Sequence, residues 1–398
     1  MSYRISTAGM HNAAISQMLA QQAKLAQTQT QISSGKRVQN PADDPIAATQ
    51  IMAMDQTRAQ LAQYPKNTES VTNRLNVGEQ ALADASNLLQ RVRDLTVQAN
   101  SAALGPTERA SIATELKSRV QELQDLANRR DANGEYLFAG MSSQTQPFSR
   151  GAGGVTYAGD QGVRAIQVSA DQRVTDGFSG QQVFMDIPQG NGTFAVAQGV
   201  HTGTGSIDPG VVTNAAAWVP GTYTLQFTTP NAWQVVDASS AVVASGAYSS
   251  GSAIGFNGAQ VTVTGSPAAG DTYTISPAGK QDVFTTVDQL ITQLTASASD
   301  PVSRATLNTQ LSGSLNQLDQ ALNHLVDLRA ETGSRLSTVD NATTSRQQLD
   351  DTLAGSVGKL QDVDYATAVS SMNQQLLGLQ AAQQAYTRIA QLSLFSYL

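Results

Sequence analysis

Cysteine is absent from the 398 residues, so the chain has no disulfide, no thiolate nucleophile and no cysteine-ligated zinc. Histidine occurs only as His11, His201 and His324, which lie too far apart for an HExxH-type metal motif. Charged side chains are 14% of the chain and aromatic ones 5%, which disfavours a catalytic pocket rich in titratable groups. The sequence therefore predicts that the protein is not an enzyme and holds no cofactor and no metal.

Positive charge is also scarce, because 24 Lys and Arg stand against 31 Asp and Glu, a formal charge of -7. Nucleic acid needs a concentrated basic face, so we expect no nucleic-acid partner. No window approaches the ~18 apolar residues of a membrane span, and we expect no membrane partner. The first seven residues have one basic side chain and no apolar run behind them, which is unlike a secretory signal peptide.

Glycine and proline gather in the middle of the chain. Residues 140–280 hold 22 of the 32 glycines, seven of the 12 prolines and both tryptophans, with no glutamate. This composition is typical of strands and turns, whereas flanks rich in Ala, Gln, Leu and Ser are typical of helices. We therefore expect an α+β protein, in which a long antiparallel coiled-coil bundle from both termini carries an inserted β-rich sandwich or barrel.

The flanks repeat apolar residues at spacings of three and four, which predicts coiled-coil-like packing. Gly105-Pro106 and Asp300-Pro301 are expected to begin two of these helices. The stripes are Ile15, Met18, Gln22, Leu25, Gln29 and Ile32; Val71, Leu75, Gly78, Leu82, Ala85, Leu89, Val92, Thr96 and Ala99; Ile112, Leu116, Val120, Leu123 and Ala127; Leu311, Leu315, Leu318, Leu322 and Leu325; and Val369, Met372, Leu376, Leu379, Gln383, Tyr386 and Ala390.

The middle part alternates with a period of two. Tyr223, Leu225 and Phe227 are predicted to face one way, with threonine and glutamine between them facing the other. Val261 and Val263 repeat the pattern, as does the stretch 271–275. These runs, separated by glycine and proline, predict antiparallel strands but leave their order open.

Each chain end contains a repeat of apolar residues. If the two ends formed only a single helix pair, the outer side of that pair would remain exposed to water. An isolated helix is marginal in water, so we expect both ends to be poorly ordered in a monomer and to order when copies pack together. Glutamine at the core-type positions 22, 29 and 383 weakens each pair and fits a conditional interface. An ordinary intramolecular bundle remains the alternative.

Asp43-Asp44 could be paired catalytic carboxylates, but a helix start is the stronger interpretation. Asp44 is then the N-cap and Pro45 the first helical residue. The stretch Gly35-Lys36-Arg37 lacks the other parts of a phosphate loop, so Gly35 is predicted to end a helix in the left-handed conformation. We expect Arg37 to pair with a carboxylate between helical layers.

The histidines and tryptophans have similarly plain interpretations. His11 is predicted on a helix surface, His324 at the rim of a helical core and His201 in a loop, each without a second ligand. Trp218 and Trp233 could stack on sugars, as in a binding module, although packing in a core or turn is favoured.

Residues 32–46, Ile-Ser-Ser-Gly-Lys-Arg-Val-Gln-Asn-Pro-Ala-Asp-Asp-Pro-Ile, resemble the N-terminal signature of the flagellin superfamily. Within this superfamily, three segments resemble the hook–filament junction proteins more than the flagellins. They are residues 4–7, residues 40–45 with their two prolines, and residues 393–398. Further motifs in the right order are residues 133–140, 281–286 and 332–336. The resemblance covers both flanks, about two thirds of the chain, and leaves the middle part aside.

The resemblance implies five parts. Residues 1–44 and 363–398 are inner coiled-coil segments, with the first disordered in the monomer; residues 45–139 and 281–362 form the surrounding helical domain; and residues 140–280 form a variable outer domain. It also implies export to the extracellular flagellum without a cleaved signal. The implied partners are hook-associated protein 1 (the hook-proximal junction protein), flagellin, copies of the same chain and a dedicated export chaperone.

The function expected from these features is structural: the chain forms the junction between hook and filament by coupled folding and self-assembly. A flagellin is the alternative, and a carbohydrate-binding fibre or adhesin is the third possibility. The signature residues expected between layers are Gly35, Arg37, Asp43, Asp44 and Pro45. The expected assembly interface consists of Ile5, Ile15, Met18, Leu25, Ile32, Val369, Met372, Leu376, Leu379, Tyr386, Leu392, Leu394 and Phe395.

Overall fold

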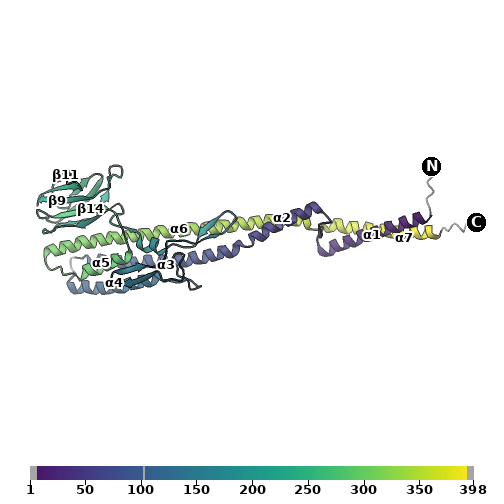
Figure 1. Ribbon diagram of the computed structural model, residues 1–398, viewed down its shortest axis with the longest axis horizontal. Helices are drawn as coiled ribbons and strands as arrows, with labels where there is room; N and C mark the ends of the chain where they lie inside the picture. Colours follow the sequence, from purple (N-terminus) through teal and green to yellow (C-terminus); the bar gives the residue numbers. More distant parts are fainter. Residues whose placement is uncertain (1–6, 102–103, 392–398) are drawn as a thin grey trace, which may run out of the picture. The chain divides into compact units, whose positions relative to one another are not determined.

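The protein is described by a computed structural model that covers residues 7–101 and 104–391 (Figure 1). The chain divides into two compact units. The first unit comprises the residues up to Pro65 together with those from Ala342 onward, and the second comprises Lys66–Asn341.

Seven helices are present in the described part of the chain: α1 (Thr7–Ser34), α2 (Pro45–Leu61), α3 (Tyr64–Ala99), α4 (Pro106–Ala127), α5 (Val283–Thr295), α6 (Pro301–Gln361) and α7 (Tyr365–Gln391). The two predicted helix starts are confirmed. Gly105 precedes Pro106 at the start of α4. The Asp300 carboxylate accepts hydrogen bonds from the backbone N–H groups of Val302 and Ser303 at 3.0 Å, which caps α6.

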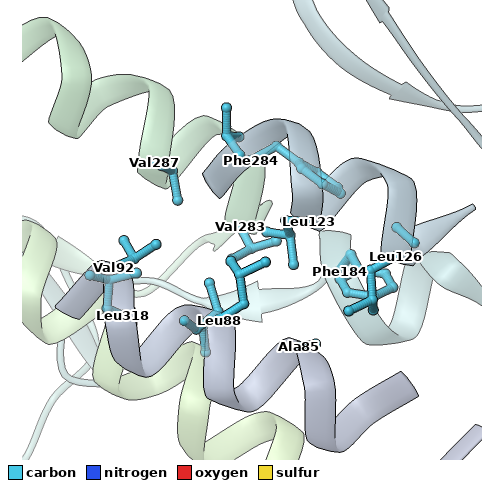
Figure 2. Packing of buried hydrophobic residues seen from close by; sticks show 14 of the residues in the cluster. Ala85, Leu88, Val92, Leu123, Leu126, Phe184, Val283, Phe284, Val287 and Leu318 are labelled. Atoms are coloured by element: carbon cyan, nitrogen blue, oxygen red, sulfur yellow. The ribbon is translucent and has the colours of Figure 1, made fainter. Parts of the chain in front are cut away.

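In the second unit, α3, α4, α5 and α6 enclose one apolar core (Figure 2). Leu88 and Val92 of α3, Leu123 of α4 and Leu318 of α6 point into it. The stripes predicted along 71–99 and 112–127 are confirmed, since all their members except Gly78 are buried. Helical periodicity therefore identified this core correctly.

Short elements of the middle part complete that helical core. They are the hairpins β1 (Phe148–Gly151) with β2 (Gly154–Tyr157) and β3 (Ala165–Gln167) with β4 (Arg173–Thr175), a π-helix, η1 (Gln181–Met185), and the pair β5 (Ile187–Pro188) with β15 (Lys280–Gln281). Phe184 of η1 lies 5.5 Å from Phe148 and 5.9 Å from Phe284, measured between ring centroids. These aromatic contacts tie the segment before residue 190 to the helices.

A β-sandwich with its own core follows. One antiparallel sheet has the order β11 (Val242–Ala247), β10 (Ala232–Asp237), β9 (Tyr223–Thr229), β14 (Thr272–Pro277), β6 (Phe194–Gln198). The other has the order β12 (Ala253–Phe256), β13 (Ala259–Thr264), β7 (Ser206–Ile207), with β8 (Val211–Val212) also paired to β13.

The predicted alternation in this sandwich is confirmed. Tyr223, Leu225 and Phe227 are buried along β9, as are Val261 and Val263 along β13. Trp218 and Trp233 pack against the same core, as the favoured interpretation of both tryptophans predicts. The expected α+β fold, with helices at both ends and an inserted antiparallel β-rich part, is thus confirmed.

None of the helices in the described ranges is long and apolar enough to cross a membrane. Among those same residues, no group of three or more His, Asp and Glu side chains is placed to hold a metal ion.

Candidate assembly interface

In the first unit, α1 and α7 lie side by side and contact each other along a narrow seam (Figure 1). The side chains that turn away from solvent repeat every three or four residues on both helices. The repeat consists of His11, Ala14, Met18, Gln21, Leu25, Thr28 and Ile32 on α1, and Ala368, Met372, Gln375, Leu379, Ala382 and Tyr386 on α7; Gln31, Ser371 and Leu376 beside it are also half-buried.

Burial along this seam is slight. Of the side chains described in α1 and α7, only Thr28 and Ala368 are buried, each 8% exposed. The Thr28 hydroxyl lies 3.2 Å from Gln375 Oε1, and Gln21 Oε1 is buried without a hydrogen-bond partner. A pair of helices held by this little buried hydrocarbon has a weak driving force for folding by itself.

The predicted interface residues fall into three groups. Met18, Leu25, Ile32, Met372, Leu376, Leu379 and Tyr386 are half-buried in or beside the seam, whereas Ile15 and Val369 are exposed. Ile5, Leu392, Leu394 and Phe395 lie outside the described residues. The interpretation of Gln22, Gln29 and Gln383 as seam positions is wrong for the helix pair of one chain, because all three are exposed.

The seam positions that the sequence reasoning missed are Ala14, Gln21, Thr28, Ala368, Gln375 and Ala382. A search for large apolar residues does not find them, because about half of the residues that form the observed seam have small or polar side chains. Spacing alone could have found them: His11, Ala14 and Met18 continue the same three–four repeat.

The outer faces of this helix pair are nearly uncharged and expose several large apolar side chains among small and uncharged polar ones. Ile15, Leu19, Val369 and Leu377 are 41–67% exposed. Residues 7–34 contain one charged side chain, Lys24, and residues 365–391 contain one, Arg388. Exposed apolar side chains on a face with so little charge are typical of surfaces that bury themselves against a partner.

The turn after α1 begins at Gly35, whose φ of +74° confirms the predicted left-handed helix end. Gly35 O accepts a hydrogen bond from Val363 N at 2.9 Å, and Arg37 N donates to Gln361 O at 2.6 Å. The Arg37 guanidinium bonds Leu360 O at 2.8 Å and pairs with Asp44 at 3.1 Å. The signature segment therefore fastens the end of α1 to the backbone between α6 and α7.

Beyond this turn, α2 packs on α6 through a small apolar cluster. Its members are Val38, Ala47, Ala48, Ile51 and Val357. Arg58 of α2 also bonds Asp350 of α6 at 2.9 Å. In the first unit, the buried hydrocarbon is thus concentrated around α2 rather than along α1 and α7.

Gly35→Ala is expected to destabilise the assembled form by about 1–2 kcal/mol, because an L-residue is strained at this φ. An added Cβ would also lie 3.1 Å from the Tyr365 hydroxyl. Thermal dissociation of the assembly measures the effect. Gly355→Ala, near the C-terminal end of α6 where an added Cβ meets open space, is the matched control and should be neutral or slightly stabilising. Equal midpoints for the two variants would contradict the strain at Gly35.

Three aspartates accept hydrogen bonds from backbone N–H groups in and beside this turn. The Asp44 carboxylate accepts a hydrogen bond from Ala47 N at 3.0 Å, which confirms it as the N-cap of α2 and, with the Arg37 contact, lowers its pKa. The pKa of Asp43 is lowered by backbone N–H groups of Asn40 and Gln39. The pKa of Asp364, before α7, is lowered by the Thr367 hydroxyl and by the N–H groups of Thr367 and Ala366.

These lowered pKa values predict acid lability. A carboxyl group with a depressed folded-state pKa stabilises the fold fully above its unfolded value of about 4 and loses that contribution as the pH falls through the folded value. We therefore expect the assembled protein to dissociate more readily below about pH 4. Light scattering against pH measures this, and Asp44→Asn should flatten the profile. A profile unchanged by that substitution would contradict the capping role.

The remaining candidate residues form no further site. His11 lies on the α1 seam with its ring 5.4 Å from Tyr386, and His324 Nε2 lies 2.7 Å from Gln182 O. His201 lies beside the buried Asp271, 3.5 Å away, within the sandwich. None of the three belongs to a group of three or more His, Asp and Glu side chains that could hold a metal ion, among the residues that the structure describes.

Comparison with known proteins agrees with this architecture. The chain matches the family model of the bacterial flagellin N-terminal helical region over residues 5–143 and that of the C-terminal helical region over residues 315–398. These matches cover α1 to α4, most of α6 and α7, and leave out the β-sandwich and α5. They define a class of protein whose N-terminal and C-terminal regions are both helical.

Flagellar hook-associated protein 3 of Escherichia coli is 26% identical over 401 residues, 98% of each chain. The protein of that name from Salmonella typhimurium is 35% identical over 184 residues, which are 46% of this chain and only 57% of that one. The crystal structure of the flagellar junction protein FlgL from Legionella pneumophila is 33% identical and superimposes with a TM-score of 0.73, covering 78% of this chain and 99% of that one.

The chain belongs to the flagellin family, in the group of flagellar hook-associated protein 3. The resemblance seen in residues 32–46 is thereby confirmed. The flagellin of Escherichia coli, in contrast, is 33% identical over only 30% of this chain.

Proposed function

We propose that this protein is a structural subunit of the bacterial flagellum, placed between hook and filament, and that it has no enzymatic activity. The relationship to hook-associated protein 3 over nearly the whole chain supports this placement. The chemistry of the signature turn adds support, because Asp44 and Asp364 cap helices and Asp43 bonds to backbone N–H groups of the turn, so these three carboxylates have structural roles.

The proposed mechanism is folding coupled to assembly. The observation that carries it is the near absence of buried side chains along α1 and α7. A subunit whose terminal helices expose Leu19 and Leu377 gains apolar burial only when other copies cover these faces. The energy that orders the chain ends would then come from neighbours in the polymer.

Several finer assignments belong to the same proposal. The expected partners are hook-associated protein 1 on the hook side, flagellin on the filament side, further copies of this chain and a dedicated export chaperone. The protein would act outside the cell and reach the flagellum without a cleaved signal. The five-part division at residues 44, 139, 280 and 362, and the interface role of the predicted residues, are proposed in the same sense.

Deleting the gene from its bacterium tests the placement. The proposal predicts hooks without attached filaments, flagellin shed into the medium as monomer, and rescue by the intact chain. Filaments that stay attached in the deletion strain would contradict it. Long filaments grown from the purified protein alone would support a flagellin instead.

A further inference from the structure

The second unit contains a cleft of about 420 Å³ that no step of the assembly proposal uses. One wall is Ala195–Gln198 of β6, and α5 and α6 supply the opposite wall. Eight of its 18 lining residues are glutamine or asparagine, and none is charged or aromatic. Such a lining offers many hydrogen-bond donors and acceptors but no counter-charge and no stacking surface.

The β6 wall is the open edge of the five-stranded sheet. Ala278 N donates to Thr193 O and Gly199 N donates to Thr272 O, so the odd-numbered residues along β6 bond to β14. The N–H and C=O groups of Val196 and Gln198 consequently point away from the sheet. A sheet edge with unpaired backbone groups is a template for one more strand.

The cleft also contains unsatisfied amide groups. Gln198 Oε1, an acceptor, and Asn316 Nδ2, a donor, are buried without hydrogen-bond partners. A buried amide atom without a partner costs free energy that a ligand with a complementary group removes. The side-chain amide has the same donor and acceptor as a peptide group, so a peptide backbone can pair with both walls.

We propose that this cleft binds an extended, uncharged peptide segment of another protein, which adds to β6 as a sixth strand. A charged segment is disfavoured because no lining residue would pair with it after desolvation. A saccharide is disfavoured because no aromatic ring is available for stacking. This site lies outside α1 and α7 and does not depend on the junction role.

The probe is an end-blocked, fluorescein-labelled peptide with the sequence of residues 242–247, which is uncharged. Fluorescence anisotropy with the full chain should show saturable binding. Val196→Pro removes the outward N–H but no bond to β14, so the sandwich should keep its fold and binding should weaken about tenfold. Val196→Thr keeps the N–H and should bind within about twofold of the original protein.

Asn316→Leu gives a second test that leaves the sheet untouched, and it should also weaken binding by about tenfold. Tryptophan fluorescence from Trp218 and Trp233 checks that each variant retains the sandwich core. The proposal would be overturned if the peptide did not bind saturably, or if Val196→Pro bound it as tightly as the original protein does. It would also be overturned if a peptide carrying two lysines bound as tightly as the uncharged peptide. Displacement of the peptide by maltohexaose would overturn it in favour of a saccharide site.

Discussion

Arg74→Met is expected to destabilise the second unit by about 3–5 kcal/mol, because it removes a buried cation that contacts Asp131, Glu135 and Asp176 at once. Arg74 Nη1 lies 2.7 Å from Asp131 and 3.3 Å from Glu135, and Nε lies 3.5 Å from Asp176. Its Nη2 also donates to Tyr136 O at 3.2 Å. The arginine thereby joins α3 to the turn at residues 131–136, which follows α4.

Burial determines the size of this effect. The side chains of Arg74 and Asp131 are each 9% exposed and that of Asp176 is 4% exposed. Removing the guanidinium leaves Asp131 in a poorly solvated site without its closest cation, whereas Asp176 keeps Arg164 at 2.6 Å. Methionine fills similar space, so the loss measures the missing charge rather than a cavity.

Urea unfolding followed by far-ultraviolet circular dichroism measures this loss. Arg91→Met is the matched control. Arg91 and Glu115 form an ion pair with an N–O distance of 2.9 Å, but their side chains are 51% and 34% exposed, respectively. It should cost about 1 kcal/mol or less. Equal losses for the two variants would show that the Arg74 network contributes no more than an exposed ion pair.

Leu25→Asp is expected to lower incorporation into the assembled polymer by about 100-fold or more, since an unpaired carboxylate in a newly buried seam costs several kcal/mol. Leu25 is only half-buried in the isolated chain. Leu25 belongs to the first unit, so the free energy of unfolding of the second unit should change by no more than is typical of an exposed substitution, about 0.5 kcal/mol. Co-assembly with labelled unmodified protein measures incorporation.

Val242→Asp, at an exposed apolar position of the sandwich, is the control for added charge and should assemble normally. The two variants carry the same new carboxylate, so a difference between them reports on the seam. If Leu25→Asp lowers the stability of the dilute monomer as a core substitution does, the helix pair is already folded and the coupled mechanism is wrong.

Much of the fold could be predicted from periodicity. The buried faces of α3 and α4 have large apolar residues at nearly every seam position, such as Leu82, Leu89, Leu116 and Leu123, so spacing and burial agree. The β9 strand alternates cleanly for the same reason. Strand order could not be predicted because the pairing of β6 with β14 joins residues about 80 positions apart, and local pattern contains no information about such pairs.

The candidate site was harder to predict. Gly35 and Asp44 follow from local turn and capping chemistry, which acts within a few residues. The seam between α1 and α7 is set by contacts such as Thr28 with Gln375, between the two ends of the chain. Many side chains in this seam are small or polar, so hydrophobicity does not distinguish it from the neighbouring repeat. Gln22, Gln29 and Gln383 were therefore wrongly predicted to lie in the seam. The Arg74 network was missed because a charged residue beside an apolar stripe usually faces water.

Amide hydrogen exchange of residues 7–34 and 365–391 tests the central claim most directly. The measurement compares the dilute monomer with the assembled protein and uses the buried helix α4 as the internal reference for a folded segment. We predict that both terminal segments exchange rapidly in the monomer and become protected on assembly, while α4 is protected in both. Protection of the terminal segments in the monomer equal to that of α4 would contradict the account.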